Sequence, residues 1–494
     1  MDRGSPSFDG LPAEHAGGHA CGGPEQAGMA SPVQTPCSDP VLASKAALER
    51  YARAAAPDEV FLADMQRRID AAAMRARTDR GVAPPRPGSA DDPLRVLLLS
   101  YSGTGNTGAD LRTIETIAQI KDVFARRTPR IKLVALGTMF DHPVLARVAK
   151  LDSPLRYLPD ALDAAVREAD LVLNVEGSTY TSKFSDSLAG ALIGGIALAH
   201  AHGCAAVAYG VDSGAMSAPL QDFVRHNATR GLVVCRNDAA RAQLARLGVR
   251  TVRGADTAWR WRACPRERAL ANGERVVALC PTNPFWWPVH AEAARAHALD
   301  AAGQTSPLRY GALHFHRWDE ARERAYEAYL TRFARLGGMW FERGYTPVIV
   351  GMEQLDETAC RALAARLPFE ARIVARGAAD LDTVAATVAH AHCVVTTRYH
   401  AAVVALSHGV PAFGLSMDER IDRLLDEAGL GDWYTRCDAP DAAARALDRI
   451  AALEDVRERA RIVAACVRYA DTQRTMLAQM GERLAQRVEA IHFG

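Results

Sequence analysis

The chain of 494 residues carries a formal net charge of +1, with 49% hydrophobic and 24% charged residues. This length suffices for two or three folded domains. The near-zero net charge argues against a nucleic-acid partner and against a polybasic membrane attachment. The ten cysteines are scattered, without a C-x-x-C pair. This spacing argues against a disulfide framework and a cysteine metal site, and it favours a reducing cytoplasm.

The sequence gives no sign of export or of membrane insertion. Residues 1–6 lack the apolar core of a signal peptide. The longest apolar stretch, residues 188–201, is short and rich in alanine and glycine. Such a stretch is typical of a buried helix, not of a membrane-spanning one. We therefore expect a cytoplasmic protein without a transmembrane segment.

The N-terminal region differs in composition from the rest of the chain. Residues 1 to about 40 are rich in Gly, Pro, Ser and Ala, which predicts disorder. Residues 41–77 show helical periodicity, and the proline-rich segment 81–93 is a predicted linker. This helix is expected to dock either on the core or on a partner.

From residue 94 onward, short apolar strands alternate with helices, a pattern typical of parallel sheets covered by helices on both faces. In the first half, strands are predicted at 95–99, 131–135, 171–175, 205–209, 232–234 and 249–252. In the second half they are predicted at 275–279, 347–350, 372–374, 393–396 and 412–415. The predicted fold class is α/β, with two Rossmann-like domains facing a central cleft. The expected regions are an extension at 1–93, domains at 94–270 and 271–435, and a helical tail at 436–494.

A cation and an imidazole follow one of the buried strands. The apolar run that ends at Thr397 leads into Arg398, Tyr399 and His400, and an alanine-rich helix starts at once. Ligands of open α/β sheets bind at the carboxyl ends of strands, and helix N-termini attract anions. Arg398 therefore suits a carboxylate or phosphate, and His400 suits proton transfer. The alternative is a histidine that packs or caps the helix.

A glycine-rich loop follows the first strand. Its glycines allow backbone N–H groups to approach a ligand closely, so we assign substrate or acceptor binding to Gly105, Asn106, Gly108 and Asp110. The loop matches G-x-G-x-x-G, but the second strand lacks the acidic residue that holds ribose in dinucleotide sites. The loop also lacks the lysine of a P-loop. A tight turn without a ligand is the alternative.

Small polar residues follow the third predicted strand. Gly177, Ser178 and Thr179 stand at its end, where hydroxyl groups suit hydrogen bonds to a polyol, so we assign them to the acceptor as well. The alternative is that Ser178 or Ser182 caps the next helix.

Two further arginines follow strands. Arg236 comes after the apolar residues 232–234, and Arg420 comes after the strand at 412–415. Both are expected to reach the cleft. In each case the alternative is a surface ion pair, with Asp238 for Arg236 and with Asp418 or Glu419 for Arg420. Asp238 is expected to cap the helix that follows Arg236.

A polar and aromatic insert at 285–318 separates the first strand and first helix of the second domain. It is expected either to cover the cleft and stack on a sugar ring or to form a packed loop. His314 and His316 would share a metal only with ligands from elsewhere, and no spacing points to such ligands.

Taken in order, these segments resemble the polysaccharide pyruvyl transferase family. The motifs that carry the resemblance are Gly105-Asn106-Thr107-Gly108, Glu176-Gly177-Ser178, Arg236-Asn237-Asp238 through Leu247-Gly248-Val249, Asp256, and Arg398-Tyr399-His400 through Gly409-Val410-Pro411. The resemblance spans about residues 95–430 and implies a GT-B-like double Rossmann fold. The sequence departs from the family pattern at Glu176, at Ala109, at Tyr399 and at Arg420, where the family has a lysine.

The resemblance also implies a reaction. Family members transfer the enolpyruvyl group of phosphoenolpyruvate to a sugar and form a cyclic pyruvate ketal. It implies that Arg236, Arg398 and Arg420 bind the donor, that His400 is the general acid/base, and that neither a metal nor another cofactor is needed. The expected partner is a sugar or glycan-precursor acceptor, not nucleic acid.

Two other functions stay open from the sequence. A GT-B glycosyltransferase using a nucleotide sugar would need an acidic residue of the second domain to hold ribose, and Glu353 or Asp356 could serve. A non-catalytic protein that keeps the fold would depend on neither His400 nor a donor.

Overall fold

The computed structural model describes residues 47, 49–51, 53–78, 92–138, 140–264, 274–306, 308–310, 313–314 and 318–492. The predicted disorder of residues 1–40 lies outside the described residues, as does the predicted linker up to residue 91. His316 of the insert lies outside them too.

The first sheet of the described chain has seven parallel strands in the order β3-β2-β1-β4-β5-β6-β7. Its strands are β1 (Arg95–Leu99), β2 (Arg130–Val134), β3 (Ala149–Leu151), β4 (Leu171–Asn174), β5 (Ala205–Val211), β6 (Leu232–Cys235) and β7 (Thr251–Arg253). The helices between them are α3 (Thr107–Val123), α4 (Pro159–Arg167), α5 (Asp186–Ala201), α6 (Ala218–Asn227) and α7 (Asp238–Ala245). The strand order reverses between β1 and β4, which is where ligands bind in doubly wound sheets.

The second sheet in the described part has six parallel strands in the order β13-β12-β8-β14-β15-β16. Its strands are β8 (Val276–Cys280), β12 (Thr346–Gly351), β13 (Arg372–Ala375), β14 (Cys393–Thr396), β15 (Ala412–Ser416) and β16 (Tyr434–Arg436). Its helices are α9 (Glu320–Glu342), α10 (Glu357–Ala364), α11 (Leu381–Ala389), α12 (Tyr399–Ser407), α13 (Glu419–Glu427) and α14 (Ala442–Ala451). The insert forms helix α8 (Ala293–Ala301) and the antiparallel strands β9 (His290–Ala291), β10 (Arg309–Tyr310) and β11 (Leu313–His314).

The two sheets present their carboxyl ends to each other. The loop after β1 meets the loop after β12, where Thr107 donates its backbone N–H to the Met352 carbonyl at 2.8 Å and Gln354 donates to the Gly105 carbonyl at 3.1 Å. These contacts and the two parallel sheets confirm the predicted fold class of two Rossmann-like domains around a cleft. The domain limits at residues 93, 270 and 435 stay a prediction.

Helix α2 (Pro57–Thr78) docks on α5 of the first domain. The sequence left open whether this helix contacts the core or a partner, and in the structure it contacts the core. Glycines of α5 make the approach possible, because a Cβ on Gly190 would lie 2.4 Å from Leu62 Cδ2 and a Cβ on Gly194 would lie 2.5 Å from Met65 Cγ. Met65 and Ile69 are fully buried there.

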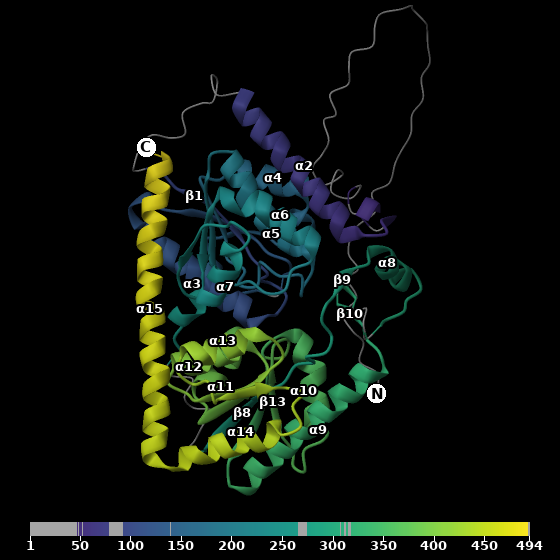
Figure 1. Ribbon diagram of the computed structural model, residues 1–494, viewed down its shortest axis with the longest axis vertical. Helices are drawn as coiled ribbons and strands as arrows, with labels where there is room; N and C mark the ends of the chain where they lie inside the picture. The colour runs from purple at the N-terminus through teal and green to yellow at the C-terminus, as the bar shows by residue number, and fades with distance from the viewer. Residues whose placement is uncertain are drawn as a thin grey trace, which may run out of the picture. The chain divides into compact units, whose positions relative to one another are not determined.

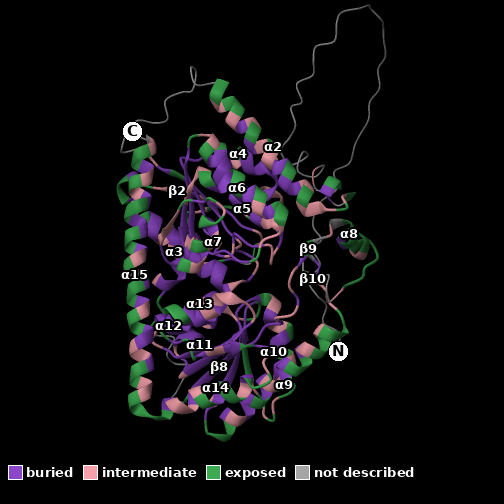
Figure 2. Cartoon of the chain, viewed as in Figure 1, coloured by how far each residue is buried: buried purple, intermediate pink, exposed green. Residues whose placement is uncertain are grey.

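The tail forms helix α15 (Val456–His492), which runs beside both Rossmann-like domains (Figure 1). It holds the first domain through the Gln119 side chain, which donates to the Leu477 carbonyl at 2.7 Å. It holds the second through Arg474, which donates to the Ser407 carbonyl at 2.6 Å. Buried residues line its inner face and the strands of both sheets, and exposed residues cover its outer face (Figure 2). Within the described residues, no helix has both the length and the apolar character to cross a membrane.

Candidate active site

Arg236 lies just after β6, buried between two carboxylates. Its guanidinium donates to Asp212 Oδ2 at 2.8 and 3.0 Å and to Asp256 Oδ2 at 2.9 Å. Burial alone would lower the pKa of Arg236, but these carboxylates and the Tyr399 hydroxyl raise it above its usual value. The guanidinium also stacks on the Tyr399 ring, 3.9 Å from its centroid. The alternative of a surface pair with Asp238 is therefore wrong.

The cap of the helix after Arg236 also differs from the prediction. The Asn237 side chain, not that of Asp238, accepts from the Ala240 backbone N–H at 2.7 Å and caps α7. Both residue types suit this position, so the sequence alone did not distinguish them.

His400 stands in the first turn of α12 and contacts the same acidic residue as Arg236. Its Nε2 lies 3.4 Å from Asp256 Oδ2, and Asp256 also pairs with Arg112 at 2.6 Å. Burial lowers the pKa of His400 more than the Asp256 charge raises it. The imidazole is therefore neutral near pH 7, the form that accepts a proton.

Arg398 stands at the start of α12 and is paired with two acidic residues. Its Nε donates to Asp356 Oδ2 at 2.9 Å, and its Nη1 lies 2.9 Å from Glu353 Oε2. Glu353 and Asp356, the ribose-binding candidates of the glycosyltransferase alternative, thus neutralise Arg398 in this structure. Burial raises the pKa of Glu353, with the Arg398 charge opposing it.

The glycine-rich loop is a contact between the two domains. The Asn106 side chain accepts from Ala109 N at 3.1 Å and caps α3, and Asn106 bridges to Glu353. Asp110 pairs with Arg376 of the second domain at 2.9 Å, and burial raises the pKa of Asp110 to about 6. Gly105 has a φ of 73°, a conformation that favours glycine. The loop is thus held by protein groups on both sides.

The residues of the Gly177-Ser178-Thr179 turn contact two different arginines, Arg236 and Arg420. Gly177 lies against Arg236, since a Cβ there would be 2.8 Å from its Nη1. Thr179 is buried and donates to the Glu176 carbonyl at 2.6 Å. The Ser178 hydroxyl instead accepts from Arg420 Nη1 at 3.3 Å. Neither Ser178 nor Ser182 caps the next helix, because Ser185 does, so that alternative is wrong.

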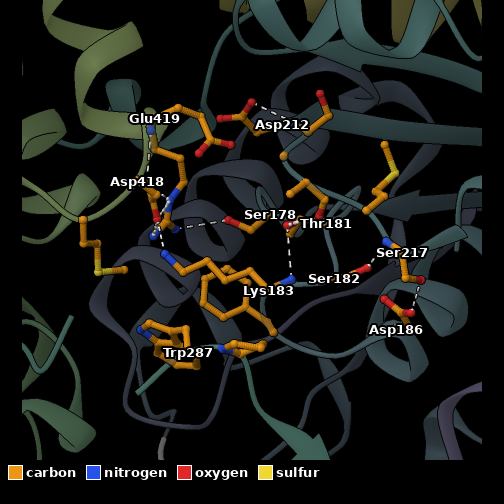
Figure 3. A pocket seen from close by; sticks show the side chains of 18 of the residues that line it. Ser178, Thr181, Ser182, Lys183, Asp186, Asp212, Ser217, Trp287, Asp418 and Glu419 are labelled. Carbon is orange, nitrogen blue, oxygen red and sulfur yellow. Dashed lines mark hydrogen bonds and ion pairs between the residues drawn. The ribbon is translucent and has the colours of Figure 1, made fainter. Parts of the chain in front are cut away.

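A pocket of about 600 Å³ opens beside this turn, between the loops of the two domains (Figure 3). Its lining includes Ser178, Thr181, Ser182, Lys183, Phe184, Asp186, Asp212, Ser217, Trp287, Asp418, Glu419 and Arg420. Asp418 lies at one end of the pocket and Asp186 with Ser217 at the other (Figure 3). The Phe184 and Trp287 rings meet edge to face with centroids 4.8 Å apart, so the wall between the two ends is aromatic.

Two cations share one carboxylate at the Asp418 end of the pocket. Arg420 Nη2 lies 2.7 Å from Asp418 Oδ2, and the Lys183 ammonium bonds the same carboxylate. Lys183 and Arg420 thus share one carboxylate, while Glu419 also lines the pocket and its charge acts on the pKa of Lys183. The sequence offered a surface ion pair of Arg420 with Asp418 as an alternative. The pair does form, but it lies inside the cleft, and Arg420 still lines the pocket.

Sequence reasoning did not select Lys183 or Asp212. Lys183 is the last of five lysines in a chain whose other basic residues are arginines, and this rarity is a signal that could have drawn attention to it. Asp212 follows β5, at the same sheet edge as the chosen residues, but nothing in its own neighbourhood marked it. Its carboxylate lines the pocket and binds Arg236, so Asp212 lies between the pocket and the His400 network.

The structure thus divides the predicted site residues into three neighbouring groups. Arg236 and His400 share Asp256, Arg420 and Ser178 share the pocket, and Arg398 sits with the glycine-rich loop. Their catalytic and binding roles stay predictions. Where the structure describes the chain, no group of three or more His, Cys, Asp or Glu side chains is arranged to hold a metal ion. Trp287 of the insert lines the pocket, and its expected stacking on a sugar is untested.

The chain is similar to one protein family and to several solved structures. A family model described as polysaccharide pyruvyl transferase matches residues 106–419. Among solved structures, the Anabaena protein HepE in complex with UDP-glucose is 16% identical, with a TM-score of 0.47 over 80% of this chain and 100% of that one. A Neisseria meningitidis UDP-GlcNAc 2-epimerase is 8% identical, with a TM-score of 0.47 over 78% of this chain and 100% of that one. No curated protein matched the chain.

Proposed function

Because this chain belongs to the polysaccharide pyruvyl transferase family, we propose that it transfers the enolpyruvyl group of phosphoenolpyruvate to a sugar. The acceptor is a residue of a polysaccharide or of a glycan precursor, and the product is a cyclic pyruvate ketal. The observation that best supports this proposal is the pocket at the carboxyl ends of both sheets, where Lys183 and Arg420 share Asp418.

The donor is a small anion with a phosphate and a carboxylate, so it needs cations that are not already neutralised. The guanidinium groups of Arg236 and Arg398 each face two carboxylates inside the protein. Lys183 and Arg420 line the pocket and share one. We therefore place the donor at Lys183 and Arg420, with the Ser178 hydroxyl beside it. Arg236 supports this site through Asp212, and a role for Arg398 in donor binding would require it to exchange Glu353 or Asp356 for the donor.

His400 is the proposed general base. Its imidazole is neutral near pH 7, and Asp256 beside it stabilises the charge that arises when the ring takes a proton. The proton it accepts is that of the attacking sugar hydroxyl, which must reach past Asp212 from the pocket, because His400 does not itself line the pocket. The oxygen then bonds to the central carbon of the donor while a proton adds to its methylene carbon, using the C=C electron pair. Phosphate leaves with the electron pair of its C–O bond, and a second hydroxyl bonds to the cation that this leaves. The second hydroxyl's proton goes to the leaving phosphate, which completes the ketal.

The acceptor fits beside the donor and extends to the other end of the pocket. Trp287 and Phe184 give an apolar wall against which a sugar ring can pack, and Asp186, Ser217 and Thr181 give hydrogen-bonding groups. Asp58 of helix α2 also lines this end. Its carboxylate accepts from the Ser187 backbone N–H at 3.0 Å at the start of α5, so a residue outside the matched family region forms part of the proposed acceptor site.

The test is turnover with a panel of glycans and glycan precursors. The proposal predicts release of inorganic phosphate from phosphoenolpyruvate together with an acceptor whose mass rises by one pyruvate ketal. His400→Asn should lose this activity, whereas His226→Asn, on the exposed face of α6, should keep it. Release of a nucleoside diphosphate from a nucleotide sugar, with no reaction of phosphoenolpyruvate, would contradict the proposal in favour of a glycosyltransferase.

A further inference from the structure

The proposed reaction needs an acid as well as a base, and the residues assigned so far supply the base. Bond formation at the central carbon of the donor requires that a proton reach its methylene carbon. Neutral His400 has a lone pair to accept a proton. Arg420 is charged, but a guanidinium does not give up its proton in proteins. The acid must be another group that faces the donor.

Lys183 has the position for this step. It stands in the loop between β4 and α5, and its side chain extends along the pocket wall to Asp418, which belongs to the loop after β15 of the other domain (Figure 3). Its ammonium lies 5.7 Å from the centroid of the Phe184 ring, and the Arg420 guanidinium lies 5.3 Å from that same ring. The two cations therefore converge on one spot, with an aromatic face below them.

Resting on the proposed function, we infer that Lys183 is a catalytic residue: its ammonium contacts the phosphoenolpyruvate and delivers a proton to the methylene carbon. The step balances as follows. A C–H bond forms at the methylene carbon from the C=C electron pair, and the Lys183 N–H bond breaks and leaves the neutral amine. The central carbon, now electron-poor, bonds to the sugar oxygen, whose proton goes to His400. Lys183 regains a proton from solvent and His400 returns one, so no oxidant or further reactant is needed.

The charges around Lys183 fit an ammonium that can give up its proton. Burial lowers the pKa of Lys183 to about 8, with Arg420 adding to this effect and Asp418 and Glu419 opposing it. An acid with a pKa near the working pH is both largely protonated and able to donate. An unshifted lysine, with a pKa of about 10.4, would hold its proton more tightly.

The inference also accounts for a departure of the sequence from the family pattern. The family resemblance places a lysine where this chain has Arg420. Both Lys183 and Arg420 bond Asp418, so an ammonium reaches the same carboxylate from the other domain. A cation that can release its proton is thus present in the pocket, although it lies after β4 and not after β15, where Arg420 stands.

The first experiment measures contact with the donor. Acetylation by acetic anhydride, followed by peptide mass spectrometry, reports the reactivity of each lysine as a function of pH with and without phosphoenolpyruvate. Lys183 should react with an apparent pKa near 8, and phosphoenolpyruvate should protect it at least tenfold. Lys132, which pairs with Glu168 on the surface, should react equally with and without the donor.

The second experiment separates binding from proton transfer. Lys183→Arg keeps the charge but not the acid, so its affinity for phosphoenolpyruvate, measured by calorimetry, should stay within about threefold of wild type, while phosphate release with an active acceptor falls by roughly a hundredfold or more. Adding Arg420→Lys to Lys183→Arg puts an ammonium back beside Asp418 and should recover part of the rate. Lys132→Arg is the matched control and should leave both quantities unchanged.

The outcomes distinguish this inference from the function on which it rests. Protein that does not bind phosphoenolpyruvate would overturn the donor assignment, and with it the role of Lys183. Binding without protection of Lys183, or a Lys183→Arg variant with the wild-type rate and pH profile, would overturn the role of Lys183 and leave pyruvyl transfer intact.

Discussion

The imidazole of His400 lies directly against the backbone of Gly108, so closely that a Cβ on Gly108 would stand 1.9 Å from His400 Nδ1. Gly108 belongs to the first turn of α3 and His400 to the first turn of α12. The two domains therefore meet at a position where a side chain larger than hydrogen displaces the proposed base. A requirement for glycine in the Gly-Asn-x-Gly loop follows from this contact.

Gly108→Ala is predicted to reduce turnover strongly, because the added methyl group forces His400 away from Asp256. Overpacking of this kind also costs about 1–3 kcal/mol of folding free energy. Gly338→Ala in α9 is the matched control, since its Cβ would meet Pro368 at an ordinary 3.5 Å. Thermal unfolding and phosphate release measure both effects. Equal behaviour of the two variants would contradict the close contact at Gly108.

Asp256→Asn is predicted to destabilise the fold by about 3–5 kcal/mol near neutral pH, because it leaves buried Arg112 and Arg236 without a shared carboxylate. These arginines and His400 hold the pKa of Asp256 well below its usual value, although burial opposes them. The ion pairs of Asp256 therefore stabilise the fold at pH values above the pKa that Asp256 has in the unfolded chain. This stabilisation is lost as the pH falls below that value. Urea unfolding of wild type and variant at neutral and acidic pH should show the difference shrinking. Asp238→Asn, on an exposed residue, should change little, and a similar loss in that control would argue against the buried network.

Met65→Ala tests the docking of helix α2 on α5. Met65 is fully buried against Gly194, so truncation should lower the free energy of unfolding by roughly 2–5 kcal/mol. Met74 lies on the same helix but is 67% exposed, so Met74→Ala should have a negligible effect. Denaturant unfolding compares the two variants. Similar small changes in both would mean that α2 does not pack on α5 in solution.

His408 is predicted to make stability depend on pH. Its Nε2 accepts from the Ala263 backbone N–H at 3.1 Å, which requires an unprotonated nitrogen. Burial, assisted by nearby arginines, lowers the pKa of His408 to about 4. Since the unfolded chain binds this proton at about pH 6.5, stability is full above that value and declines as pH falls toward 4, by at most about 3 kcal/mol. His408→Gln should flatten this part of the curve of unfolding free energy against pH, and an unchanged slope would contradict the assignment.

Most helices and strands could be predicted from the sequence, because the apolar periodicity that marks each one lies within its own segment. β3 and β16 were missed, since β3 is a short edge strand of Ala-Lys-Leu and β16 is the three-residue strand Tyr434–Arg436. Such strands owe their existence to pairing with a neighbour, which no local pattern records. The predicted strand at 412–415 is therefore followed in the structure by one more strand, β16.

The sequence predicted which residues gather at the candidate site, but not which of them form ion pairs with one another. Residues after strands gather at one edge of a sheet, and this rule found Arg236, Arg398, His400 and Arg420. Which carboxylate neutralises which arginine depends on how the strand ends of one sheet are brought side by side, so the partners Asp212 and Glu353 could not be read from spacing. Lys183 was missed because its partner Asp418 belongs to the other domain and lies 235 positions away in the sequence.

The measurement that tests the central claim most directly is calorimetric titration with phosphoenolpyruvate near neutral pH. Wild type should bind it saturably. Arg420→Ala should bind at least about tenfold more weakly, since a charge-assisted hydrogen bond contributes roughly 1.5–3 kcal/mol. Arg241→Ala, which removes a partly exposed arginine paired with Asp238, should bind as wild type does. Binding of a nucleoside diphosphate in place of phosphoenolpyruvate, or phosphoenolpyruvate binding that Arg420→Ala leaves unchanged, would contradict the account.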